Sequence, residues 1–97
     1  MKNREHFNSL KSQPRPIREA AHAVGLDYQA PYTRHGKEYY KPYRNGFSVP
    51  DCGSMIWENF ERTGKAKRDS DGIYHLTRAG LDWLGETLGI TIYDEMR

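Results

Sequence analysis

Hydrophobic residues recur along this chain with helical spacing in several separate segments. Ile17, Ala20, Ala21 and Val24 follow an i, i+3, i+4, i+7 pattern, which begins after a proline and stops at Gly25. Proline suits the first turn of a helix and glycine suits the position after its end, so this segment predicts a helix. By the same kind of pattern we expect helices near residues 4–11, 16–24, 54–63 and 78–88.

One segment near the C-terminus predicts a strand that runs into a helix without a loop. Residues 73–76 are suited to a strand, and the leucines of residues 78–88 then repeat on one helical face. Only Thr77 stands between them, and its side chain is expected to satisfy the first free amides of the helix. Gly80 would let the helix lie close to the preceding strands, so strand and helix would share one core.

A different pattern fills residues 28–49, where aromatic residues are interleaved with cations. Asn45-Gly46 predicts a tight turn, and Pro42 predicts an edge strand or an interruption. We therefore expect an irregular basic β-ribbon. Its aromatic members are Tyr28, Tyr32, Tyr39, Tyr40, Tyr43 and Phe47, and its cations are Arg34, Lys37, Lys41 and Arg44.

Size and charge limit the class of protein. The 97 residues suffice for one domain, residues 1–97, whose small core a homodimer would help to stabilise. The net charge of +2 is unevenly spread: residues 1–50 carry nine Lys/Arg and four Asp/Glu (+5), and residues 51–97 carry six and nine (−3). The basic half is where a polyanion would bind. A single cysteine, no apolar leader and no long apolar run favour a cytoplasmic protein without a membrane segment.

Residues 54–88 resemble winged-helix repressors of the MarR and PadR type. A polar turn at residues 69–72 joins two short strands into an expected two-stranded wing over residues 65–77. The resemblance rests on a tyrosine-x-leucine-threonine-x-x-glycine-x-x-x-leucine signature at Tyr74, Leu76, Thr77, Gly80 and Leu84, and on Gly64, Lys65 and Arg68. It implies an α+β, winged-helix-like domain of three to four helices, here with the additional basic ribbon, that regulates transcription by binding DNA. In size and style the chain also resembles small phage or prophage accessory proteins.

Metal binding and catalysis find little support in the sequence. His22, His35 and His75, with Asp51 and Cys52, match no short zinc-ligand spacing. Cys52 precedes a helix, which can lower the pKa of a thiol, but no base partner is identifiable. We therefore expect no metal, no cofactor and no enzymatic activity.

The expected function is non-catalytic binding of nucleic acid, with duplex DNA favoured. Cations would contact phosphates and tyrosines would position or stack on bases. The alternative is that the tyrosines pack on the small core and the cations, including those of the wing, are simply solvated. The expected contact residues are Arg34, Lys37, Tyr39, Tyr40, Lys41, Tyr43 and Arg44 in the ribbon and Lys65, Lys67 and Arg68 in the wing.

A rival hypothesis is a phage-type module that binds and modulates a host or partner protein. The acidic C-terminal half favours it, because acidic side chains on the helix over residues 54–63 would be repelled by phosphates. Glu58 and Glu61 are the acidic residues of that helix. The acidic residues in and after the last predicted helix, which would meet a basic protein partner, are Asp82, Glu86, Asp94 and Glu95.

Overall fold

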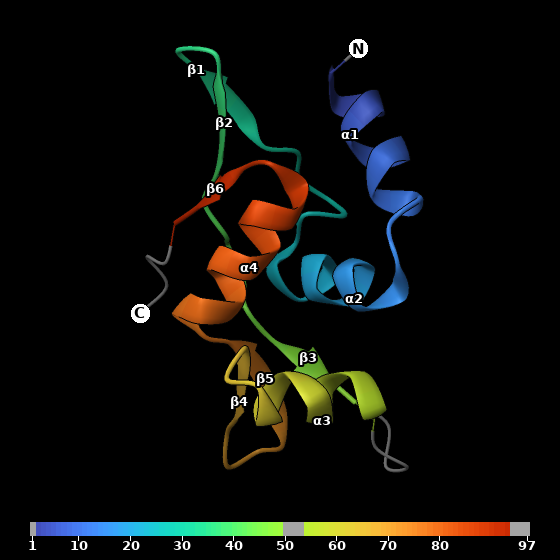
Figure 1. Cartoon of the computed structure of the whole chain (residues 1–97), viewed down its shortest axis with the longest axis vertical. Coiled ribbons are helices and arrows are strands. Elements are labelled where there is room, and N and C mark those ends of the chain that lie inside the picture. The colour runs from blue at the N-terminus through green and yellow to red at the C-terminus, as the bar shows by residue number, and fades with distance from the viewer. Residues whose placement is uncertain (1, 50–53, 94–97) are drawn as a thin grey trace.

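The computed structural model describes residues 2–49 and 54–93, with side chains from residue 6 onward. It is a small α+β fold of four helices and two small sheets among these residues (Figure 1). The helices are α1 (Lys2–Lys11), α2 (Arg15–Val24), α3 (Met55–Arg62) and α4 (Arg78–Leu88). The strands are β1 (Tyr32–Arg34), β2 (Lys37–Tyr40), β3 (Phe47–Ser48), β4 (Ala66–Arg68), β5 (Ile73–Leu76) and β6 (Thr91–Ile92). The α+β class and the four helices are as predicted.

The two sheets lie at opposite ends of the long axis, with α2 and α4 between them (Figure 1). The first sheet has the order β1-β2-β6, in which β1 and β2 are antiparallel and β2 and β6 are parallel. The β1–β2 hairpin turns at His35 and Gly36, whose φ angles of 54° and 77° are the left-handed pair that a tight hairpin requires. The second sheet has the order β3-β5-β4 and contains the antiparallel β4–β5 hairpin, which was predicted over residues 65–77.

Aromatic and aliphatic side chains from both ends meet in one core. Trp57 of α3 is fully buried, with Phe47 stacked on it at a ring-centroid distance of 4.7 Å. Its indole Nε1 donates a hydrogen bond to Glu19 of α2 at 3.0 Å, so the one polar atom of this buried ring has a partner. The largest fully buried side chains are Trp57, Tyr40, Leu26, Leu81, Leu84 and Val24.

The helix ends follow the sequence signals closely. Thr77 accepts a hydrogen bond from the amide of Gly80 at 3.1 Å, and Ser54 accepts one from Trp57 at 3.4 Å, as N-cap residues do. Gly25 ends α2 in the left-handed conformation. The predicted strand-to-helix junction at Thr77 is therefore confirmed in its geometry.

The predicted basic ribbon is not one element. Its residues divide between the hairpin of the first sheet and strand β3 of the second sheet. Asn45-Gly46, expected to form a tight turn, lies instead in extended chain. The Asn45 side chain donates to the Leu76 carbonyl (2.9 Å) and accepts from the Leu76 amide (2.8 Å), which continues the β3–β5 pairing with a side chain. The Gly46 amide donates to the Ala23 carbonyl at the end of α2. Tertiary contacts thus override the local turn signal.

Candidate nucleic-acid interface

One face of the first sheet combines a row of tyrosines with two cations. Tyr32 pairs with Tyr39 across β1 and β2, and their rings stack at 5.9 Å. Tyr93 extends the parallel pairing by donating its amide to the Tyr40 carbonyl at 2.9 Å, and its ring stacks on Tyr39 at 5.9 Å with an interplanar angle of 9°. The rings therefore form one aromatic row across three strands.

The cations of this face follow from the alternation of side chains along a strand. Arg34 and Lys37 are directly paired, two residues along β1 and β2 from the Tyr32–Tyr39 pair, so all four side chains lie on the same face. We call this surface the tyrosine face; it consists of Tyr32, Arg34, Lys37, Tyr39, Thr91 and Tyr93. Both cations are exposed, and Tyr32 is 48% exposed.

The surroundings of Tyr93 favour the protonated, uncharged form of its phenol. Partial burial raises the pKa of Tyr93, and the nearby Tyr32 and Tyr39 hydroxyls raise it further, while the Arg34 guanidinium lowers it. Tyr93 therefore adds no charge to that of Arg34 and Lys37.

Tyr40, expected to position or stack on a base, is instead a core residue. It is 1% exposed, and its hydroxyl donates a 2.6 Å hydrogen bond to the carbonyl of Val24 at the end of α2. Burial raises the pKa of Tyr40 far above its ordinary value, which is the behaviour of a phenol sealed from water. Its ring has no free surface for a ligand, and we remove it from the set of contact residues.

Arg44 is held by protein groups at the C-terminal end of α2. Its guanidinium donates to the carbonyl of His22 at 2.6 Å and lies 3.4 Å from Asp27. It also lies over the rings of Tyr28 and Tyr43, at 5.1 and 5.6 Å. These contacts place the guanidinium at the C-terminal end of α2, where the helix dipole favours cations. The structure thus gives Arg44 and Tyr43 a stabilising role, apart from the tyrosine face.

The wing cations lie at the other end of the molecule. Lys65 contacts the hydroxyl of Thr63 at 3.2 Å and lies 5.6 Å from the Trp83 ring. Arg68 lies over Tyr74 at 5.5 Å, and Lys67 is exposed on the outer side of β4. Of the ten predicted contact residues, Arg34, Lys37 and Tyr39 come together on the tyrosine face, whereas Tyr43 and Arg44 contact each other at the end of α2. Lys41 is exposed and follows the end of β2.

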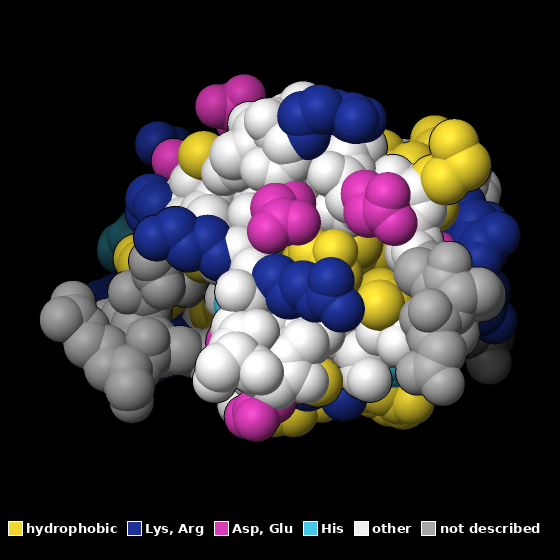
Figure 2. All heavy atoms as spheres, turned by 90° about the horizontal axis from the view of Figure 1, so that it is seen from below, with side chains coloured by type: hydrophobic (Ala, Val, Ile, Leu, Met, Phe, Trp, Pro, Cys, Tyr) yellow, Lys and Arg dark blue, Asp and Glu magenta, His cyan; other side chains and the backbone are white. Residues whose placement is uncertain are grey.

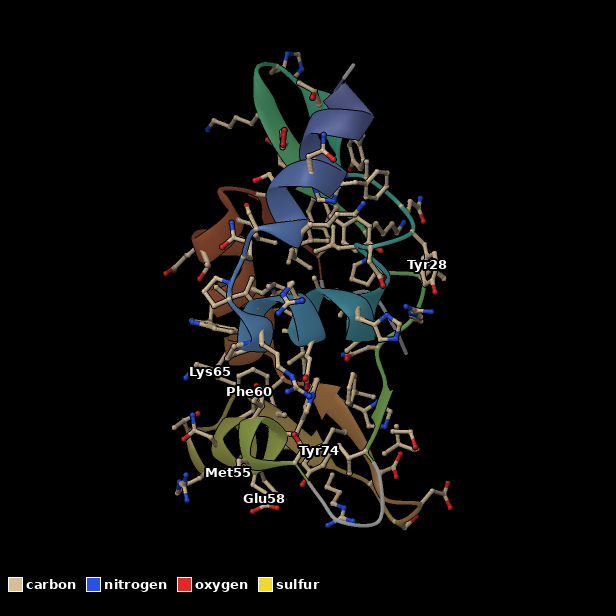
Figure 3. All side chains as sticks on the ribbon, turned by 90° about the vertical axis from the view of Figure 1, so that its right-hand side faces the viewer. Tyr28, Met55, Glu58, Phe60, Lys65 and Tyr74 are labelled. Atoms are coloured by element: carbon tan, nitrogen blue, oxygen red, sulfur yellow. The ribbon has the colours of Figure 1, made fainter. Side chains whose placement is uncertain are left out.

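Charges of both signs share the end of the molecule formed by α3 and the second sheet (Figure 2). Glu58 and Met55 project from α3 away from the body, whereas Phe60 and Tyr74 lie on the inner side (Figure 3). Glu61 is exposed as well. A phosphate chain approaching α3 would meet these carboxylates, so this end is a poor polyanion surface.

The histidines are dispersed among separate partners. His22 lies 2.6 Å from Asp27, and His35 occupies the hairpin turn. His75 contacts Asp69 at 2.6 Å through Nε2 and the Asn45 carbonyl through Nδ1. Within residues 6–49 and 54–93, no three His, Cys, Asp or Glu side chains gather as metal ligands would. Asp51 and Cys52, and the acidic Asp94 and Glu95, lie outside the described residues.

Tyr32, Thr91 and Tyr93 are the members of the tyrosine face that the predicted contact set lacks. Tyr32 belonged to the aromatic segment, and its alternation with Arg34 was the available signal. Tyr93 is separated from Tyr39 by more than fifty residues, and only the parallel β2–β6 pairing brings them together. No local pattern could have indicated that contact.

Comparison of the chain with protein-family models, curated proteins and solved structures yields no match. Among the described residues, no helix has the length and apolar character needed to cross a membrane.

Proposed function

We propose that this protein is a non-catalytic nucleic-acid-binding protein whose contact surface is the tyrosine face. The observation that carries the proposal is the row of three stacked tyrosines beside the Arg34–Lys37 pair. Cations neutralise phosphates, and aromatic side chains offer surfaces on which bases stack. A half-exposed aromatic residue on an edge strand, flanked by cations, is the combination that such binding uses.

The alternative within the same function is backbone contact by the wing, as the winged-helix resemblance implies. Lys67 is the cation that this mode would use most directly, because it faces outward from β4. Against this mode stand the carboxylates of Asp69 and Asp71 in the adjoining turn and those of α3. The tyrosine face has its two cations adjacent and is the better-supported surface.

Removing the cations of each surface in turn tests which of the two surfaces binds the nucleic acid. We would measure binding of a labelled oligonucleotide by fluorescence anisotropy at two salt concentrations, for the Arg34→Gln/Lys37→Gln double variant and for Lys67→Gln as the matched control. The double variant should bind more weakly and lose about 1.4 from the slope of log affinity against log salt, the value for two phosphates of a single strand. Lys67→Gln should bind like the wild type. If only Lys67→Gln weakens binding, the contact lies on the wing.

A second function, a protein-interaction module, is favoured by one observation on α3. Met55 is 87% exposed and lies one helical turn before Glu58, with Glu61 one further turn along. An exposed methionine beside carboxylates suits a basic, partly apolar partner surface. Alanine substitution at Glu58, Glu61, Asp82 and Glu86 should abolish partner capture if this function holds. Unchanged capture by that variant would remove its basis.

A further inference from the structure

The spacing of the tyrosine face suits a single nucleotide strand. The aromatic row and the cation pair are two residues apart along β1 and β2, which is about 7 Å in a strand. A nucleotide spans a comparable distance between its base and its phosphate. A base stacked on Tyr32 would therefore leave its phosphate beside Arg34 and Lys37.

The number of cations on the tyrosine face also favours a single strand over a duplex. A duplex hides the faces of its bases, so it would use the cations of this surface and leave the tyrosines without partners. Duplex binding draws most of its sequence-independent affinity from phosphate contacts, and it grows with the number of phosphates that the protein neutralises. The tyrosine face has two cations, and Glu38 lies on the opposite side of the same hairpin. Stacking must then supply most of the affinity, and only unpaired bases can stack.

We infer that the ligand of the tyrosine face is single-stranded nucleic acid, bound by base stacking on the Tyr32 end of the aromatic row and by phosphate contacts to Arg34 and Lys37. This inference rests on the proposed function and narrows it. It replaces the duplex preference that the sequence suggested with a preference for unpaired nucleotides. Tyr32 and Tyr93 are the two ends of the row, and Tyr32 is the accessible one, because it is 48% exposed whereas Tyr93 is only partly exposed.

The experiment compares ligands and tyrosines in one anisotropy series. The probes are labelled oligothymidylate, oligouridylate and a hairpin duplex of matched length, each titrated with wild type, Tyr32→Ala, Tyr32→Phe and Tyr28→Ala. Tyr28 is the matched control, because it is 68% exposed but lies beside Arg44, away from the tyrosine face. The thermal unfolding of each variant would verify that its fold is retained.

We expect the wild type to prefer both single strands to the duplex by at least about tenfold, since stacking on one aromatic residue is commonly worth that much. Tyr32→Ala should lose roughly five- to a hundredfold of the single-strand affinity. Tyr32→Phe keeps the ring and should bind like the wild type, as should Tyr28→Ala. The affinity for single strands should fall only about sevenfold between 50 and 200 mM salt, the value for two phosphate contacts.

The experiment distinguishes failure of the single-strand inference from failure of the proposed function. Equal or tighter binding of the duplex would overturn the single-strand inference while leaving nucleic-acid binding intact. An unchanged affinity in a folded Tyr32→Ala variant would overturn the stacking role. Failure of all three probes to bind at low salt would overturn the proposed function itself.

Discussion

The carbonyl oxygen of Lys65 occupies the place that a side chain on Gly80 would need. A Cβ on Gly80 would lie 2.0 Å from that oxygen, far inside any permitted contact. The same carbonyl accepts the amide of Thr77 at 2.9 Å, and the Thr77 hydroxyl caps the helix at Gly80. The start of α4 is thus pressed against the exit of α3, and only a glycine permits the approach.

Gly80→Ala should destabilise the protein by about 2 kcal/mol or more, because backbone must shift to relieve the clash. In an open helical position the same substitution would stabilise by roughly 1 kcal/mol, so the sign of the effect tests the packing. Urea unfolding followed by circular dichroism would measure it. Glu86→Ala, at an exposed position of the same helix, should change the unfolding free energy by less than about 0.5 kcal/mol. A neutral or stabilising Gly80→Ala would refute the close approach.

The junction between β5 and α4 was predictable from the sequence, because the residues that specify it are close together in the chain. The Thr77 cap, the polar turn before it and the glycine three residues later all lie within a dozen positions. The first sheet was not predictable in the same way, because β6 joins β2 from across the chain and no pattern announces that register. In the aromatic segment, hydrogen bonds to the Leu76 backbone override the turn signal of Asn45-Gly46, and His35-Gly36 forms the hairpin turn instead.

The sequence predicted only part of the candidate site, because composition is a local signal and the facing of each side chain is not. Composition identified the aromatic and basic segment, but it could not separate side chains that face the core from those that face outward. Tyr39 and Tyr40 are neighbours in sequence, and the pleat of β2 sends Tyr40 into the core and leaves Tyr39 in the aromatic row.

Tyr40→Phe should lower the unfolding free energy by about 1–2 kcal/mol, because the carbonyl of Val24 loses its hydrogen-bond donor in a buried site. Thermal unfolding would register this as a fall of several degrees, in line with about 4–8 °C per kcal/mol for a domain of this size. Tyr43→Phe, at a half-exposed ring, should be nearly neutral. Single-strand affinity should be unaffected in Tyr40→Phe, and a selective loss of affinity at unchanged stability would contradict the core assignment.

The His75–Asp69 pair should make stability depend on pH in a defined direction. The hydrogen bond to Asp69 raises the pKa of His75, which partial burial opposes and the Asn45 carbonyl reinforces. Hydrogen bonds from His75 and from the amide of Ile73 lower the pKa of Asp69. Lys67 lies opposite His75 in the strand register, so its positive charge is close to that of a protonated His75.

A raised histidine pKa contributes stability that is complete below the ordinary value and is lost as pH rises through the raised value. A lowered aspartate pKa contributes stability above its ordinary value, which is lost as pH falls through the lowered one. The free-energy difference between wild type and His75→Gln should therefore be largest near pH 5–6 and shrink toward pH 8.5. Chemical unfolding of both proteins across that range would measure it. A difference that grows with pH would mean that the folded state holds His75 neutral.

The most direct test of the central claim is to locate the ligand on the protein. Backbone and side-chain NMR resonances of the labelled protein would be followed during titration with a short single-stranded oligonucleotide at low salt. The account predicts that the shifts centre on Tyr32, Arg34, Lys37, Tyr39 and Tyr93, with α3 and the β4–β5 hairpin unperturbed. Shifts centred on Lys67, Arg68 and α3, with the tyrosine face silent, would contradict it and return the binding surface to the wing.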